Sequence, residues 1–202
     1  MKNVDPRLWG HSAWNVLHYV SFYSKSSIDD LRSFFQAIQF VLPCSKCRES
    51  YMTHLMNLPF PSQKDGLPKW LFLLHQRVNA TIPGQENPSF RWVSKQWHSK
   101  SKQDISTLDG WPFLFAMSKA YPSSKENVQF RRPFQNAVCT VLSELSNTIL
   151  ENTPVKCNEW IGKRNYNAWL KETYQAFYDV QRVPDRLAHI GNGVTCKDSC
   201  KL

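Results

Sequence analysis

The chain is poor in glycine and has no long apolar run. Only 7 of its 202 residues are glycine, and no apolar stretch approaches the roughly 18 residues that a membrane-spanning helix needs. The N-terminal residues also lack the apolar segment of a signal peptide. We therefore expect no membrane partner and synthesis in the cytosol. Scarce glycine and long apolar-periodic stretches indicate an all-α fold of helices joined by proline-containing loops.

Cysteine and charge are also limited. Six scattered cysteines are too few for a small disulfide-stapled domain. The net charge is +9, but no block of like charges stands out. A basic surface for an acidic partner or nucleic acid is one interpretation. An ordinary solvated surface is favoured, so no nucleic-acid partner is expected.

The apolar periodicity of the first half predicts four helices. Ser12 and Ser27 are the expected N-caps of the first two, and Pro43 ends the second. Pro68 is a first-turn proline of the fourth. Residues 81–104 look irregular. The expected helices span residues 11–23, 28–41, 44–58 and 68–80.

The second half repeats the first weakly, at offsets of 97, 99 and 99 residues. The matched residues are Trp14 with Trp111, Phe35 with Phe134, and Trp70 with Trp169. Three matches in order indicate a degenerate internal duplication. The second copy lacks the polar groups of the first: Phe115 replaces His18, Tyr174 replaces His75, and Ser143 and Ser146 fall near the positions of Cys44 and Cys47.

Cys44 and Cys47 form a CxxC pair after Pro43, at the expected start of a helix. Backbone N–H groups and the helix dipole at such a position stabilise a thiolate and lower its pKa. The alternative is half of a zinc site. A second CxxC is absent, and the spacing of His54 and His75 matches no common zinc pattern. A redox disulfide is favoured over zinc, and no metal is expected.

Two pairs of ring or amide side chains are spaced to share a helix face. Trp14 and His18 form one pair, and His75 and Asn79 form the other. Flat rings beside a CxxC suit stacking on a planar cofactor. Core packing is favoured for each residue taken alone, whereas the residues taken together with the CxxC favour a cofactor site.

Three motifs together resemble the Erv/ALR family of FAD-linked sulfhydryl oxidases. They are Gly10-His11-Ser12-Ala13-Trp14-x-x-x-His18, Pro43-Cys44-x-x-Cys47, and Trp70-Leu71-x-x-x-His75-x-x-Val78-Asn79. The resemblance implies a four-helix bundle that holds FAD beside the redox disulfide. It implies that Cys44 exchanges disulfides with substrate and that Cys47 faces the flavin. The residues it assigns to FAD are Gly10, His11, Ser12, Trp14, His18, His75, Val78 and Asn79.

The chain departs from the family pattern at three places. Gln76 stands where Asn is common, and no lysine follows Val78-Asn79. Lys95, Arg91 or Arg77 could replace that lysine at the FAD phosphates. Phe72 stands where many members carry a structural cysteine.

The duplication resembles quiescin-type and some large-DNA-virus oxidases, which pair an active module with a pseudo-module. The expected domains are an FAD-binding module over residues 1–104, a helical pseudo-module packed as a pseudo-dimer over 105–190, and a cysteine-containing tail over 191–202. The chain is most similar to compact viral members, which places it in the host cytoplasm or the virion. A monomer and a homodimer both remain open.

The other four cysteines have less defined roles. Cys196 and Cys200 lie in a glycine-containing tail and resemble the shuttle cysteines of the family. An incidental or structural tail disulfide is equally expected. Cys139 is expected to be a small buried side chain. A bond between Cys139 and Cys157 is the alternative.

The sequence thus predicts a thiol oxidase. It would form disulfides in thiol-containing protein substrates through Cys44 and Cys47, with FAD as cofactor, and pass electrons to oxygen to give hydrogen peroxide. The alternative is a basic helical interaction protein without enzymatic activity, stabilised by zinc in one version.

Overall fold

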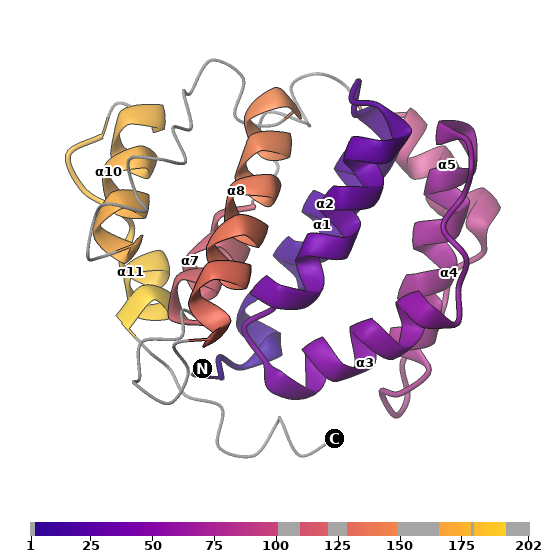
Figure 1. Cartoon of the computed structure of the whole chain (residues 1–202), viewed down its shortest axis with the longest axis horizontal. Helices are drawn as coiled ribbons and strands as arrows, with labels where there is room; N and C mark the ends of the chain where they lie inside the picture. Colours follow the sequence, from indigo (N-terminus) through magenta and orange to yellow (C-terminus); the bar gives the residue numbers. More distant parts are fainter. Residues whose placement is uncertain (1–2, 101–109, 121–128, 149–165, 179, 193–202) are drawn as a thin grey trace.

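The computed structural model describes residues 3–100, 110–120, 129–148, 166–178 and 180–192 (Figure 1). These residues form helices and contain no β-strand, which confirms the expected all-α fold. None of the described helices is both long and apolar enough to cross a membrane.

The first half contains four main helices close to their expected positions. They are α1 (Pro6–Tyr23), α2 (Ile28–Val41), α3 (Ser45–Met56) and α4 (Leu67–Asn79), with the short 3-10 turn η1 (Lys64–Gly66) before α4. The Ser27 side chain caps α2 by accepting from the Asp30 N–H, as expected. The Cys44 side chain caps α3 by accepting from the Cys47 N–H.

The start of α1 differs from the expectation. The helix begins at Pro6, and Asp5 is its N-cap because its carboxylate accepts a hydrogen bond from the Arg7 N–H at 3.0 Å. Pro6 suits the first turn, where its missing N–H costs nothing. Ser12 lies inside the helix, so its expected role as N-cap is wrong. Its hydroxyl instead accepts from the Phe113 N–H at 3.2 Å.

A fifth helix, α5 (Phe90–His98), lies within the region expected to be irregular. Ser89 caps it by accepting from the Trp92 N–H. Val93 and Trp97, one turn apart, are its buried residues, and Phe90 lies half-buried one turn before Val93. The expectation was wrong because Pro83, Gly84 and Pro88 all precede Ser89, so they do not interrupt the short apolar pattern of the helix.

The second half contributes α7 (Trp111–Lys119), α8 (Arg131–Thr148), α10 (Tyr166–Tyr178) and α11 (Asp185–Asn192). Helix α7 packs against α1, α8 runs along α2, and α10 and α11 cover α7. Figure 1 shows α8 beside α1 and α2 at the centre, with α4 and α5 on one side and α10 and α11 on the other.

One hydrophobic core spans both halves of the chain. Phe34 and Phe35 of α2 and Phe113, Phe115 and Phe134 of the second half are fully buried in it. Gly110 allows the close approach of α7 to α1, because a Cβ at this position would lie 2.8 Å from Val16 Cγ2.

A buried carboxylate also joins the halves. Glu144 of α8 is 5% exposed and accepts hydrogen bonds from the Ser24 and Ser26 hydroxyls at 2.5 and 2.7 Å. Charged oxygens accept stronger hydrogen bonds than neutral ones. This contact therefore holds α8 to the loop that follows α1.

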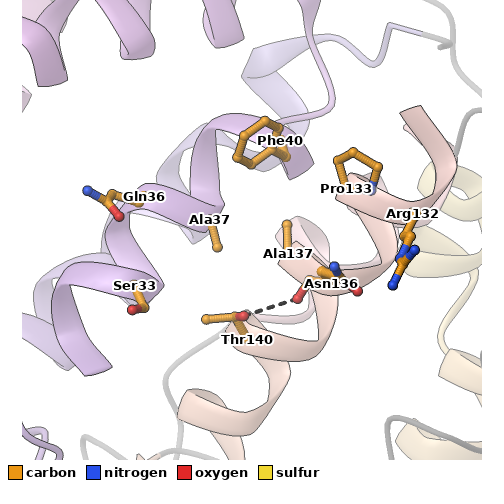
Figure 2. Close-up of a pocket in the computed structure, with 9 residues that line it drawn as sticks. All are labelled: Ser33, Gln36, Ala37, Phe40, Arg132, Pro133, Asn136, Ala137 and Thr140. Atoms are coloured by element: carbon orange, nitrogen blue, oxygen red, sulfur yellow. Dashed lines mark hydrogen bonds between the residues drawn. The ribbon is translucent and has the colours of Figure 1, made fainter. Parts of the chain in front are cut away.

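A shallow groove runs between α2 and α8 (Figure 2). Ala37 and Ala137 point toward each other across it, so small side chains allow the two helices to approach. Phe40 and Pro133 lie at one end. The lining residues are Ser33, Gln36, Ala37, Phe40, Arg132, Pro133, Asn136, Ala137 and Thr140.

Candidate functional site

The CxxC pair forms a disulfide at the start of α3. The Cα atoms of Cys44 and Cys47 are 5.1 Å apart, and Cys44 Sγ accepts from the Cys47 N–H at 3.2 Å. Cys44 is 1% exposed, whereas Cys47 is half-buried at the edge of the core. Free N–H groups at a helix start stabilise negative charge. A thiolate released here would therefore be favoured.

Arg48 fixes the chain around the disulfide. Its guanidinium donates to the Leu42 carbonyl at 2.6 Å, which ties the first turn of α3 to the end of α2. Burial lowers the pKa of Arg48 from its usual value, but an arginine remains charged at neutral pH. It therefore keeps a cation within one turn of Cys44.

Two of the predicted ring residues stack directly. Trp14 of α1 and His75 of α4 have ring centroids 3.8 Å apart and planes 10° apart. His18, one turn after Trp14, joins them through a 3.2 Å hydrogen bond between its Nε2 and Nδ1 of His75. The structure thus brings together the three rings that the sequence singled out.

Both histidines are neutral at physiological pH. Burial, with a smaller contribution from the neighbouring His75, lowers the pKa of His18 to about 3. Burial also lowers the pKa of His75 to about 4, with an added contribution from His11. Neutral imidazoles can share one hydrogen bond, because one nitrogen donates and the other accepts.

His18 has an unused polar atom. Its Nδ1 is buried and has no hydrogen-bond partner within the described part of the chain. A buried polar atom without a partner is costly, and a bound water, ion or ligand is the usual explanation for one. The Nδ1 of His18 therefore has room in its bonding for a group from outside the described chain.

Trp97 of α5 extends the cluster and was missed in the sequence. Its ring lies 5.7 Å from that of His18, with planes 27° apart, and 5.8 Å from that of Phe22. The signal that could have found it is the apolar spacing of Phe90, Val93 and Trp97. We call Trp14, His18, His75 and Trp97 the ring cluster.

The other predicted cofactor residues lie near the ends of these helices. Val78 and Asn79 are half-buried in the last turn of α4, where Asn79 donates to the Asn87 side chain at 2.9 Å. Gly10 and His11 lie in the second turn of α1, with His11 exposed. The Ser12 hydroxyl is directed to α7 through its bond to Phe113.

The basic residues considered for phosphate binding lie in different places. Arg77 donates to the Asn57 carbonyl at 2.9 Å, toward the end of α3. Arg91 and Lys95 are exposed on α5. Lys100 was not predicted, and its Nζ lies 4.9 Å from the centre of the Trp97 ring. A cation is thus present beside the ring cluster.

The second half contains a second group of three rings at the corresponding positions of the repeat. Trp111 and Phe115 of α7 are 6.4 Å apart, compared with 6.3 Å for Trp14 and His18. Tyr174 of α10 lies 4.9 Å from Trp111 but edge-on to it, with planes 75° apart, whereas His75 stacks on Trp14 with planes 10° apart. Ser143, by contrast, lies inside α8 and not at a helix start, so the match to the region of Cys44 fails.

The remaining cysteines and metal-binding groups add little. Cys139 is half-buried in α8 and forms no disulfide within the described residues. Cys157, Cys196 and Cys200 lie outside the described residues, so their predicted roles stay predictions. In the parts of the chain that the structure describes, no three histidine, cysteine or acidic side chains gather where they could hold a metal ion.

A redox-type disulfide and neutral stacked rings on an all-α scaffold define a class of helical thiol–disulfide protein. The Erv1 / Alr family model matches residues 11–98, which include the CxxC pair and the whole ring cluster. A protein of Invertebrate iridescent virus 6, named as a putative FAD-linked sulfhydryl oxidase, is 36% identical over 95 residues, or 41% of this chain and 86% of the relative. This chain belongs to the Erv1/Alr family.

A protein of Acanthamoeba polyphaga mimivirus, named as a probable FAD-linked sulfhydryl oxidase, is 34% identical over 85 residues. The match covers 38% of this chain and 59% of that relative. A similarly named protein of Invertebrate iridescent virus 3 is 27% identical over 88 residues, which cover 60% of it. The chain thus spans little more than half of two relatives. No solved structure matches it.

Proposed function

We propose that this chain is an FAD-linked thiol oxidase that forms disulfides in protein thiols. The observation that carries the proposal is the Cys44–Cys47 disulfide at a helix start, packed on the same hydrophobic core as the neutral ring of Trp14. The names of the viral relatives support the same activity. Neither a disulfide alone nor a ring cluster alone would distinguish an oxidase from a structural protein.

The residues fit a flavin chemically. Trp14, His75 and Trp97 offer flat, uncharged faces for stacking, and the free Nδ1 of His18 offers one hydrogen bond. Trp14 and His75 touch, so a third ring has no space between them and would lie against their outer faces or separate them. Val78 and Asn79, with the Gly10–Ser12 turn, are the further residues that the family pattern assigns to FAD.

The bound flavin would supply two-electron chemistry and transfer to oxygen, with hydrogen peroxide as product. The protein residues perform the thiol exchange. A substrate thiolate attacks Cys44 Sγ, the Cys44–Cys47 bond breaks, and Cys47 leaves as a thiolate at the edge of the core. A second substrate thiolate then attacks the mixed disulfide, which releases oxidised substrate and leaves both cysteines reduced. Exchange depends on the thiolate fraction and on access to the attacked sulfur.

The second half supports a pseudo-module. The rings of Trp111, Phe115 and Tyr174 cluster at the positions that correspond to Trp14, His18 and His75, with fewer polar groups and with Tyr174 edge-on to Trp111. Contacts of α1 with α7 and of α2 with α8 are the kind that a dimer of two like modules would make. We infer a division near residues 104–105, which lie outside the described residues, and one FAD for each chain, in either a monomer with an internal pseudo-dimer or a homodimer.

One preparation tests the proposal against its alternative. Purified protein should show visible flavin absorption, contain one FAD for each chain, and consume oxygen when dithiothreitol is added. It should release hydrogen peroxide in proportion to the oxygen consumed. A colourless preparation that contains zinc and consumes no oxygen would instead support the interaction protein.

A further inference from the structure

The N-terminal residues lie directly on the redox loop. The Val4 N–H donates to the Pro43 carbonyl at 2.7 Å. The Asn3 side chain accepts from the Ser45 N–H at 2.9 Å and donates to the Ser45 hydroxyl at 3.3 Å. We call residues 3–5 the N-terminal strap. It forms hydrogen bonds with both chain neighbours of Cys44.

The strap is anchored at one end. Val4 is 1% exposed in the same core as Cys44, and its carbonyl accepts from the Trp9 indole N–H at 3.2 Å. Asp5 caps α1 and pairs with Arg7 at 2.6 Å. Asn3 is the outermost described residue of the strap and is half-buried. Its contacts can therefore open while α1 stays folded.

The strap matters because Cys44 is 1% exposed. Disulfide exchange requires a thiolate to reach the sulfur that it attacks, so access limits the rate. At this exposure Cys44 is out of reach of a substrate thiol in the closed arrangement. Opening of the Asn3 contacts would free the Ser45 main-chain N–H directly beside Cys44.

The groups that the strap uses are main-chain groups. The Ser45 N–H belongs to the first turn of α3, where no helix carbonyl is available to accept from it. The Pro43 carbonyl accepts from the main-chain N–H of Val4. An extended peptide lying beside it would offer the same kind of donor. An extended peptide can satisfy both groups by adding its own main chain. A small dithiol has no groups for such pairing.

We propose that the strap controls access to Cys44, and that an extended, cysteine-bearing polypeptide displaces Asn3, accepts from the Ser45 N–H and donates to the second lone pair of the Pro43 carbonyl. This substrate class rests on the proposed thiol oxidase function. In the exchange, a substrate S–S bond to Cys44 forms as the Cys44–Cys47 bond breaks. Cys47 keeps the electron pair as a thiolate, and the attacking thiol has first lost its proton to water.

The first experiment measures access to Cys44 without oxygen turnover. Full-length protein is mixed with dithiothreitol under nitrogen, quenched with acid, and alkylated so that new thiols are counted by mass. Asn3→Ala should speed reduction of the disulfide by about tenfold, as expected from the loss of two hydrogen bonds of ordinary net strength. Asn136→Ala, the same change on an exposed residue of α8, is the matched control and should leave the rate unchanged.

A second variant keeps the test decisive where Asn3→Ala does not fold. If Asn3→Ala melts at a much lower temperature, Ser45→Ala decides, because it removes only the 3.3 Å bond from Asn3 and keeps the main chain intact. It should speed reduction by a smaller factor, about threefold. Equal rates for the folded variants and the parent protein would overturn the proposed control of access.

The second experiment tests the substrate class. A reduced peptide with two cysteines is compared with the same peptide carrying N-methyl groups on the amides beside the cysteines. The thiols are identical, but the methylated peptide cannot donate to the Pro43 carbonyl. The unmodified peptide should reduce the disulfide at least several times faster; equal rates would refute main-chain pairing. Both experiments follow the disulfide alone, so they remain readable in a preparation that lacks oxidase activity.

Discussion

The rings of Trp14 and His75 lie face to face, 3.8 Å apart, although they come from different helices. Their contact joins α1 to α4 at the place where His18 and Trp97 also meet. Flat neutral rings stack both inside a hydrophobic core and against a bound flavin, so the stacking alone does not distinguish the two. The free Nδ1 of His18 is a polar atom that a purely apolar core would not contain, and it supports the proposed flavin site.

Removal of the Trp14 ring should weaken flavin binding. Loss of a stacking partner typically costs about 1–3 kcal/mol, so Trp14→Ala should lower FAD affinity by about tenfold or more. Flavin content and fluorescence titration of stripped protein would measure this. Trp92→Ala is the matched control, because Trp92 is 56% exposed on α5. Equal losses in both variants would contradict a role for the ring cluster.

Stability should fall on mild acidification because His18 and His75 are buried and neutral. Their pKa values are about 3 and about 4 in the folded chain, against about 6.5 when unfolded. The unfolded state therefore binds more protons below pH 6.5, and stability present above that pH is lost as pH falls toward 4. His18 alone should contribute a loss of about 1.5 kcal/mol between pH 6.5 and 5.

The matched variant for this prediction is His18→Phe, which copies the residue at the corresponding position of the second ring group, Phe115. Urea unfolding at pH 7.5, 6.5 and 5 should show a smaller acid loss than in the parent protein. An unchanged pH dependence would show that His18 is not the group responsible.

Cys47→Ser should separate flavin binding from turnover. The serine removes the thiolate that leaves when the disulfide is attacked, while the ring cluster is untouched. The variant should keep its FAD and lose almost all oxygen consumption with dithiothreitol. Cys139→Ser, at the half-buried cysteine of α8, should keep both. Full activity in Cys47→Ser would disprove the assigned role.

An aromatic contact holds α5 where many family members would have a cysteine. Phe72 of α4 lies 5.3 Å from Phe90, and Lys69 Nζ lies 5.0 and 4.6 Å from the two ring centres. Phe72→Ala should destabilise the chain by about 3 kcal/mol, because it leaves a cavity in a buried cluster. Hydrogen exchange should become faster in α5. Phe130→Ala, at a 48% exposed residue, should change stability little.

The tail cysteines should affect protein substrates alone if they act as a shuttle. Replacement of Cys196 and Cys200 by serine should preserve the oxidation of dithiothreitol and slow the oxidation of a reduced protein. Oxygen uptake with both substrates is the measurement. Each single replacement should have the same effect as the double replacement, since loss of either cysteine breaks the pair. Unchanged rates with both substrates would remove the shuttle from the scheme.

Local features of the fold could be predicted from the sequence. The range of α2 and its Ser27 cap, and the approximate range of α4, follow from side-chain spacing and from short-range hydrogen bonds. The start of α1 was placed too late, because Asp5 and Pro6 form a cap that is recognised only when the helix is known to begin there. Helix α5 was not predicted, because it directly follows a segment rich in proline and the whole region was expected to be irregular.

The candidate site could be predicted in part. Trp14, His18 and His75 were singled out, and the structure brings them together. The sequence could not place Trp97, because its contacts with His18 and Phe22 join residues more than 70 positions apart in the chain. Nor could it show that the Ser12 hydroxyl contacts α7 and not the ring cluster.

The sequence by itself determined the helical fold, the CxxC at a helix start and the family pattern, because each depends on residues close together in the chain. Only the tertiary structure decided that Asn3 and Val4 bond to the two chain neighbours of Cys44 and that one core joins both halves. It also decided which faces of α1 and α4 meet at Trp14 and His75. These contacts depend on how whole helices pack, and helix packing is set by many distant side chains together.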